Sequence, residues 1–326
     1  MAREDFPEWY GEDARLLGDD EGMRRLAYDV DGTDGTIAFT DFAVFAGIHM
    51  GLMDVRASQG HSVTPLRHDV LEIVHCRRGR FECELARDTC VCVAEGDFAV
   101  TSTALIAERV RYSFPFNSFL GIAVVIDFAA LTPETRQVLA ALSIDLDRLH
   151  ENLCLEERWF TGACTDSIGR VFSDLYEAVR TNDRCCFRLK VLELLFLVER
   201  FHAEEGRHGT YCSGSRARTV RLMRDRLVSG LGERISLEGL AREHGIGLTL
   251  FQNAFRDIYG LTPYAYLKHY KMHQAAARLT DGTESVAEIA QSLGYRNASK
   301  FAGAFKDVLG TTPREYRRMN TVLEQS

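Results

Sequence analysis

The sequence predicts an α+β multidomain protein, with a strand-rich N-terminal part and an all-α C-terminal domain built from two similar units. Three observations support this fold class. Short β-rich runs separated by turn residues fill residues 35–127, which favours a small β-barrel or sandwich. From Pro133 onward, apolar residues recur every three or four positions, as they do in helices. Near the C-terminus, FAGAFKDVLGTTPREYRR (residues 301–318) repeats the pattern of FQNAFRDIYGLTPYAYLK, which stands fifty residues earlier.

Six β-rich runs make up the N-terminal part, and we assign residues 1–130 to this first domain. Breaks typical of hairpins separate several of them, at residues 77–80, 86–88 and 95–97. The runs are GTIAFTDFAVF, VLEIVHC, RFECELA, TCVCVA, DFAVTST and FLGIAVVIDF.

Residues 131–203 are predicted to be helical, and the segment RCCFRLKVLELLFLVERFHAEE is apolar on much of its circumference. Such a helix must be buried, either within its own domain or against a partner chain. A twofold dimer needs an apolar surface that can contact its own copy, and the stripe from Phe187 to Phe201 is a candidate for it. The alternative is that the stripe packs only on its own barrel. The polar, Gly- and Ser-rich residues 204–218 then predict a linker.

The remaining residues, 219–326, contain the duplicated unit. Each copy is predicted to be a helix, a tight turn and a second helix, over residues 236–260 and 285–310, with a connecting helix at 263–280. In the second copy, Ser285 and Glu288 form a capping box that starts the first helix. Two short helices that cross at a glycine turn form a helix-turn-helix, whose second helix can enter the major groove of DNA. Single corners of this kind occur in many helical domains, but two copies in register favour DNA binding.

The charge distribution agrees with a DNA-binding C-terminal domain. Residues 211–326 contain 17 Lys and Arg against 11 Asp and Glu, a net charge of +6, whereas the whole chain carries −8. The N-terminal 210 residues therefore carry −14. An acidic body joined to a basic segment indicates that only the C-terminal part meets a polyanion.

The C-terminal hundred residues, 219–318, resemble the AraC family of bacterial transcription regulators. The second copy carries the signature in IAQSLGYRNASKFAGAFKDVLGTTPREYRR, with Ile-Ala, Gly-Tyr, the spaced Phe pair, Gly-x-x-Pro and Tyr-Arg. The resemblance implies two helix-turn-helix units on a shared helix, whose recognition helices enter successive major grooves of double-stranded DNA, about 34 Å apart. It also implies that the protein activates transcription by RNA polymerase at nearby promoters more often than it represses.

Carried over position by position, the resemblance assigns DNA-contacting positions to both recognition helices. Gln and Asn can each pair with adenine through two hydrogen bonds. The chain departs from the family at Asn253 and Gly303, where an Arg is common, and at Lys271, where the connecting helix usually carries an Arg. The candidate DNA-binding residues are Thr249, Gln252, Asn253 and Arg256 in the first copy, and Ala298, Ser299, Lys300, Ala302, Gly303 and Lys306 in the second.

The N-terminal domain resembles, more weakly, the cupin-like sensor domain that many such regulators carry, in the stretch from His68 to Thr103. His61, His68 and Glu72 are the candidate ligand-binding residues. Cupin metal sites typically use His-x-His followed by Glu and a later His, and the spacing here differs, so we predict no metal, no cofactor and no enzymatic activity. In a strand, residues 68 and 72 share a face while His75 points to the other.

The cysteines, the apolar runs and the N-terminus indicate in which compartment the protein resides. The nine cysteines form no CxxC pair, which indicates reduced thiols; a thiol sensor or a thiolate metal site is the less favoured alternative. No apolar run approaches the roughly 18 residues that would cross a membrane, and the acidic N-terminus is unlike a secretory signal. We therefore expect a cytoplasmic protein that does not interact with membranes.

The hypothesis from the sequence is a ligand-responsive, homodimeric transcription factor in which an unidentified small molecule binds the barrel. Two alternatives stay open. One is a cupin-type metalloenzyme fused to a DNA-binding domain, and the other is a DNA binder that needs no ligand.

Overall fold

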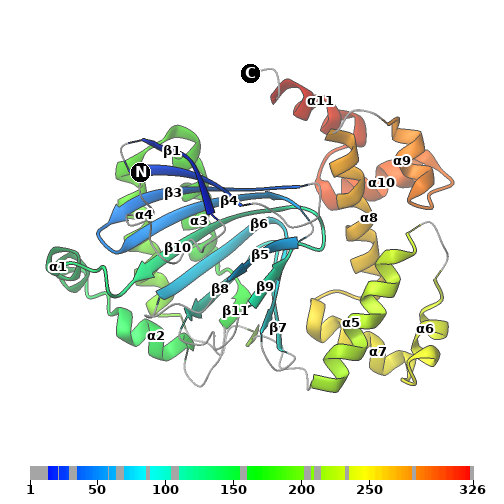
Figure 1. Cartoon of the computed structure of the whole chain (residues 1–326), viewed down its shortest axis with the longest axis horizontal. Coiled ribbons are helices and arrows are strands. Elements are labelled where there is room, and N and C mark those ends of the chain that lie inside the picture. The colour runs from blue at the N-terminus through cyan, green and yellow to red at the C-terminus, as the bar shows by residue number, and fades with distance from the viewer. Residues whose placement is uncertain are drawn as a thin grey trace. The chain divides into compact units, whose positions relative to one another are not determined.

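The computed structural model describes residues 14–20, 22–28, 35–57, 59–63, 70–85, 89–103, 110–154, 160–201, 207–208, 214–231, 235–280 and 284–323. The chain divides into two compact units, residues 1–211 and 212–326 (Figure 1). The first unit is rich in strands and the second is helical, as the sequence predicts. Within the described part of the chain, no helix combines the length and the apolar character needed to cross a bilayer.

The strands of the N-terminal unit pair antiparallel in the order β1-β2-β3-β4-β10-β6-β8-β11-β12. The long strand β6 pairs with β10 and β8 through its first half, and with β7 and β9 through its second half. Strand β9 also pairs with β5. The strands are β1 (Ala14–Asp20), β2 (Met23–Tyr28), β3 (Thr36–Phe45), β4 (Ile48–Arg56), β5 (Gln59–Val63), β6 (Val70–Leu85), β7 (Thr89–Ala94), β8 (Asp97–Ser102), β9 (Val110–Ser113), β10 (Phe119–Asp127), β11 (Phe160–Ala163) and β12 (Arg207–His208).

Alternate residues of these strands point to two separate cores. Leu71 and Ile73 of β6 face the outer core, which lies between the sheet and the helices of this unit. Val74 and Cys76 of the same strand face the inner core, which also contains Phe81 from the second half of β6. The inner core therefore lies between the two parts of the sheet, and we call the side of the strands that lines it the inner face.

Four helices follow or interrupt the strands and cover the outer face (Figure 1). Three of these helices begin at a residue that commonly caps helices. The side chains of Thr132, Thr165 and Asp183 each accept a backbone hydrogen bond at the start of α1, α3 and α4. The helices are α1 (Pro133–Ala141), α2 (Leu146–Cys154), α3 (Asp166–Thr181) and α4 (Arg184–Glu199).

The apolar stripe of α4 packs on its own chain, which corrects one prediction. The buried residues along it, from Phe187 through Val191, Leu194 and Val198 to Phe201, all belong to the outer core. The stripe is thus unavailable for a dimer contact, and the alternative that it packs on its own sheet is the right one. The region 131–203 is also not purely helical, because β11 inserts there and pairs with β8.

The predicted linker at 204–218 is too long. Its residues 207–208 form β12, which pairs with β11. Helix α5 (Gly214–Ser229) begins four residues before the predicted end of the linker. Both differences arise because pairing with a distant strand and helix propagation override a polar composition.

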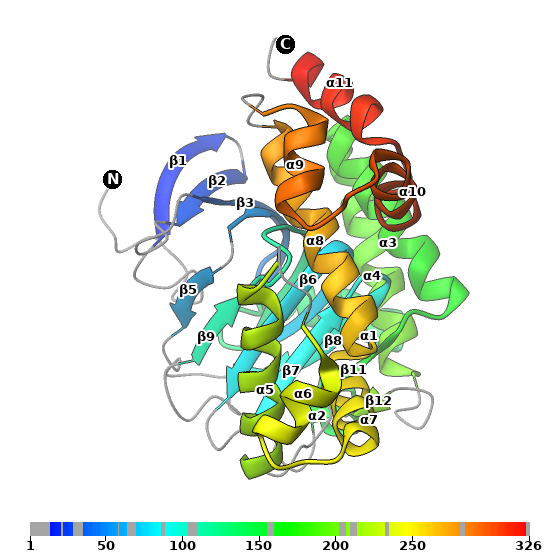
Figure 2. The ribbon, with the colours of Figure 1, turned by 90° about the vertical axis from the view of Figure 1, so that its right-hand side faces the viewer.

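The C-terminal unit consists of two helix pairs arranged along one long helix, α8. The first pair is α6 and α7, and the second pair is α9 and α10 (Figure 2). Helix α8 contacts α5, α7, α9, α10 and α11. The helices are α6 (Leu237–Glu243), α7 (Leu248–Tyr259), α8 (Pro263–Thr280), α9 (Val286–Ser292), α10 (Ala298–Leu309) and α11 (Pro313–Leu323).

Candidate nucleic-acid interface

The turn in each helix pair is built around a glycine with a positive φ. Gly245, after α6, has a φ of 67°, and Gly294, after α9, has a φ of 82°. A residue with a Cβ is disfavoured in this left-handed region, so glycine allows the first helix to end and the second to start within a few residues. The repeat in the sequence therefore corresponds to two similar turns in the structure.

The start of each first helix is capped by a serine side chain. Ser236 accepts a hydrogen bond from the backbone of Gly239. Ser285 accepts one from the backbone of Glu288, whose carboxylate accepts in return from the backbone of Ser285, at 2.8 Å. The capping box is therefore present in the second pair.

Helix α7 is anchored by an aromatic face. Phe251 and Phe255 are fully buried. The ring of Phe255 lies 4.6 Å from that of Tyr259 and 5.4 Å from that of Tyr266 in α8. Because one side of α7 is buried against α8, its opposite side is fixed in orientation and faces solvent.

The predicted contact residues of the first copy gather on this solvent side of α7. Thr249, Asn253 and Arg256 are exposed, and Gln252 is half-buried at the edge. Their spacing of three and four residues places them on one face of the helix. The structure thus brings these four side chains together.

In α10 the equivalent face carries few long polar side chains. Phe301 and Phe305 are buried, as their counterparts in α7 are. The exposed face carries Ser299, Gly303 and Lys306, with Ala302 half-buried at its edge. Lys306 is thus the only long side chain among these four predicted positions.

Two further predicted positions of the second copy flank this face. Lys300 is exposed, but one residue of helix turns it about 100° away from Ser299, toward the side that carries Asp307. Ala298 is exposed at the first turn, directly after the N-cap Asn297, whose side chain accepts from the backbone of Ser299 and Lys300. Lys300 is about 60° from Gly303 around the helix and, like Gly303, lies away from the buried Phe301 and Phe305.

Salt bridges and hydrogen bonds hold the second pair on α8. Arg278 donates from Nε to Glu284, at 2.6 Å, and from Nη1 to Ser292 at the end of α9, at 2.6 Å. Lys268 lies 3.1 Å from Asp307 of α10. The ammonium of Lys271, whose pKa is lowered by burial, lies 6.0 Å from the Tyr295 ring. Lys271 thus makes a packing contact where the family usually has an Arg.

Sequence reasoning missed a hollow between α9 and α10. It has a volume of about 710 Å³ and includes Gln291, Arg296 and Ala298. Arg296 and Gln291 are exposed. A basic residue in the turn between two helices is the signal that identifies Arg296 as a further candidate for a phosphate contact.

Of the three predicted ligand-binding residues in the N-terminal unit, the structure describes the side chain of one, Glu72. Glu72 lies on the inner face, and burial raises its pKa to about 7. His75 points to the outer face, as predicted, where its ring stacks on Phe172 at 4.3 Å and burial lowers its pKa to about 4. The side chain of His61 and all of His68 lie outside the described residues. Among described side chains, no three or more of His, Cys, Asp and Glu could hold a metal ion together.

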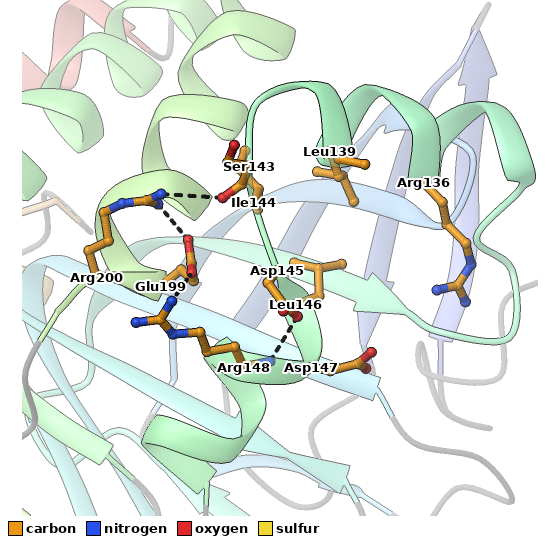
Figure 3. A pocket seen from close by; sticks show the side chains of 11 residues that line it. Arg136, Leu139, Ser143, Ile144, Asp145, Leu146, Asp147, Arg148, Glu199 and Arg200 are labelled. Carbon is orange, nitrogen blue, oxygen red and sulfur yellow. Dashed lines mark hydrogen bonds and ion pairs between the residues drawn. The ribbon is translucent and has the colours of Figure 1, made fainter.

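A second hollow, of about 510 Å³, lies between α1, α2 and the end of α4 (Figure 3). Three of its charged side chains, Arg148, Glu199 and Arg200, pair with one another. The carboxylate of buried Glu199 lies 2.5 Å from Arg200 and 3.8 Å from Arg148, and Arg200 also donates to the carbonyl of Ser143. The arrangement is that of an ion-pair network that fastens α4 to the α1–α2 segment.

Comparison with known proteins shows which family the C-terminal unit resembles. Residues 240–319 match the family described as "Helix-turn-helix domain". The virulence regulon transcriptional activator VirF of Yersinia enterocolitica is 33% identical over 81 residues, which cover 25% of this chain and 30% of VirF. The chain carries an AraC-type helix-turn-helix domain. The matched segment, residues 240–319, includes residues of both helix pairs and of α8.

Two further proteins are similar to the chain over a comparable share of its length. The RCS-specific HTH-type transcriptional activator RclR of Escherichia coli (strain K12) is 37% identical over 86 residues, which cover 26% of this chain and 30% of RclR. The DNA-binding domain of AdpA, solved in complex with a target DNA, has 25% sequence identity and a TM-score of 0.31, covering 33% of this chain and 97% of that domain. The chain matches about 30% of the length of VirF and RclR, so these likenesses concern the AraC-type domain alone.

Proposed function

We propose that this protein is a sequence-specific DNA-binding transcriptional regulator and that α7 and α10 are its two recognition helices. The observation that carries the proposal is the repeat itself. Two helix pairs with the same positive-φ glycine turns and the same buried phenylalanine pairs are arranged along one helix, α8, and each leaves one face of its second helix exposed. Helix α8 has 18 residues, which corresponds to a length of about 27 Å. This length suits two helices that enter successive major grooves about 34 Å apart.

The roles within the interface differ between the two helices. Gln252 and Asn253 contact base edges, with Thr249 beside them, because amide side chains can recognise adenine. Arg256 and Lys306 neutralise phosphates from the ends of the two faces. The α10 face contributes mainly backbone positioning, since its central residues, Ala302 and Gly303, have no polar side chain.

Chemical protection of the operator tests this arrangement. With the full-length chain, methylation protection should reveal two protected major-groove segments on one face of the duplex, one helical turn or about 10–10.5 base pairs apart. A single protected segment, or two on opposite faces, would contradict the paired-helix arrangement. Variants of Gln252 should relax sequence preference only in the segment bound by α7.

We propose further that the N-terminal unit is a cupin-like barrel that senses a small molecule and controls activation. The two relatives named as activators support activation, and the inner core between two parts of one sheet supports a barrel. In this proposal the protein is not an enzyme, acts with RNA polymerase and resides in the cytoplasm. Operator binding and transcription that ignore every candidate metabolite would favour a ligand-independent regulator instead.

A homodimer is part of the proposal, through the outward side of α4. Its buried stripe faces the sheet, but Leu189 and Phe196 are 68% and 40% exposed on the other side. Leu189→Glu should convert a dimer to a monomer in light scattering, whereas Val138→Glu, at an exposed apolar position of α1, should not. Monomeric wild-type protein at micromolar concentration would contradict this part of the proposal.

A further inference from the structure

A row of polar side chains crosses the inner face of the N-terminal unit. His49 of β4 and Glu72 of β6 are both in register with Val125 of β10, and Glu72 is in register with Thr101 of β8. Residues in register on antiparallel strands share a face. Val125 belongs to the inner core, so His49, Glu72 and Thr101 face it too.

Asp41 of β3 lies diagonally beyond one end of this row, because its partner in β4 is Gly51, two residues from His49. Its Oδ2 lies 3.0 Å from Nδ1 of His49. The residues two and four positions before it, Phe39 and Ile37, belong to the inner core, so Asp41 points to the same face. Arg24 of β2 is in register with Asp41, but its Nε pairs with Asp19 at 3.2 Å.

Two atoms in the row are buried without a hydrogen-bond partner. Asp41 is 1% exposed, and its Oδ1 has none. Thr101 is 3% exposed, and its Oγ1 also has none. Most buried polar atoms in folded proteins are paired, and an unpaired one costs about 1–3 kcal/mol. Two such atoms on one face, in strands that are not neighbours, indicate that a bound molecule supplies the missing donors.

The charge of the row selects the kind of molecule. Asp41 and Glu72 are carboxylic acids, and the pKa of the Tyr28 hydroxyl is raised first by burial and then by the charges of Glu72 and Asp41. An anion would be repelled here. A metal ion is disfavoured because the described side chains form no ligand cluster. Organic cations have both the charge and the N–H donors that the row lacks.

The separation of the two acids sets the shape of that cation. Asp41 and Glu72 lie on strands three positions apart in the sheet order β3-β4-β10-β6, which corresponds to roughly 14 Å between backbones. Side chains on a face that encloses a core converge and shorten this distance. A single ammonium group cannot satisfy both ends, whereas a linear molecule with an ammonium at each end can.

We propose that the inner face binds a linear diamine or polyamine, with one ammonium group at Asp41 and another between Glu72 and Thr101. The proposal rests on the proposed function, because it names the chemical class of the molecule that the regulator senses. The hydrocarbon chain of the ligand lies over Val125 and its apolar neighbours. Asp41 and Glu72 are then the residues that select ligands by charge and length.

The test uses the full-length chain and titration calorimetry with putrescine, cadaverine and spermidine. At least one of these should bind saturably, while propylamine and 1,4-butanediol bind at least tenfold more weakly, because each lacks one or both charges. Asp41→Asn and Glu72→Gln should each weaken binding tenfold or more. Asp54→Asn is the matched control, since Asp54 lies on neighbouring β4 but alternates with Val55 and therefore points to the outer face.

Circular dichroism of the variants separates loss of binding from loss of folding. Failure of all three amines to bind, equal binding of 1,4-butanediol, or saturable binding of Mn²⁺ or Zn²⁺ instead of amines would overturn the proposal. Operator affinity measured on the same samples tests the proposed function separately. Amine binding without any change in operator affinity or transcription supports the site and contradicts the proposed ligand response.

Discussion

At the scale of single residues, the main contrast is between the two exposed faces of α7 and α10. The first has two amide side chains, Gln252 and Asn253, where the second has Ala302 and Gly303. The buried residues of the two helices are nearly the same, because both must pack on α8. Packing on α8 therefore accounts for the likeness of the two helices, whereas their exposed faces are not constrained by it.

Truncation of Gln252 should weaken recognition of one operator segment. Because a good bidentate contact to a base discriminates by about 1–3 kcal/mol, Gln252→Ala should reduce specific affinity by this amount and leave non-specific affinity nearly unchanged. Competition binding with operator and scrambled DNA measures both quantities. Gln137→Ala, at an exposed position of α1 in the other unit, is the matched control. Equal loss for both variants would show that the first recognition helix is misassigned.

Glu72 should make the stability of the N-terminal unit fall as the pH rises. Its pKa is raised from 4.5 to about 7 by burial, so the folded state holds the proton more tightly than the unfolded state between these values. Stability is therefore greatest below about pH 4.5, decreases through pH 7 and stays low above it. Glu72→Gln should remove this decrease and stabilise the protein at pH 8 by up to about 3 kcal/mol.

Urea unfolding at pH 4.5, 6 and 8 measures this effect. Glu151→Gln, at an exposed position of α2, serves as the control and should leave the pH profile unchanged. His75 contributes with the opposite sign below pH 6.5, because its lowered pKa makes the folded state lose stability as the pH falls toward 4. The informative quantity is hence the difference between Glu72→Gln and wild type at each pH. An identical pH profile for the two proteins would rule out a buried acid at this position.

At the scale of elements, the helix pairs owe their shape to short-range signals. The caps at Ser236, Ser285 and Asn297 are all set by local sequence, because a cap depends only on residues within one turn of it. The same holds for Gly260 and Gly310, which end α7 and α10. Both copies could therefore be predicted helix by helix.

The two N-caps offer a direct comparison of the helix pairs. Ser285→Ala breaks a reciprocal capping box, whereas Ser236→Ala removes a single hydrogen bond, so the first should cost more within the usual range of about 0.5–2 kcal/mol. Chemical unfolding followed by circular dichroism measures both. A larger cost for Ser236→Ala would mean that the packing of α6 matters more than its cap.

At the scale of the whole molecule, the opposite charges of the two units are the dominant electrostatic feature. Residues 1–210 carry −14 and residues 211–326 carry +6. The acidic unit should lower non-specific DNA affinity, because it adds negative potential near the DNA-binding domain. Residues 212–326 expressed alone should bind scrambled DNA several-fold more tightly than the full chain at 50 mM salt, and the difference should shrink as salt screens it. Equal affinities at low salt would contradict this expectation.

The limits of sequence reasoning were set by contacts between distant residues. Nothing near Arg207 and His208 predicts a strand, since their partners are Phe160 and Thr161 of β11. The partner of the α4 stripe cannot be predicted from the sequence for the same reason. The residues of the inner-face row cannot be predicted from the sequence either. Bulges such as the one opposite Leu120 and Gly121 shift the strand register. A shift of one residue exchanges the inner and outer faces. Glu72 was a candidate, but Asp41 and Thr101 carry no local signal.

Gly303 has a consequence for how such a regulator changes its targets. A Cβ added there meets no atom within 4 Å, and glycine inside a helix costs about 0.5–1 kcal/mol relative to alanine. Gly303→Asn would copy the first helix at this position without a steric conflict. Selection of binding sites from random DNA should then yield a new base preference opposite α10 and an unchanged one opposite α7. In the proposed function, one half of the operator can thus diverge while the fold and the other half-site stay as they are.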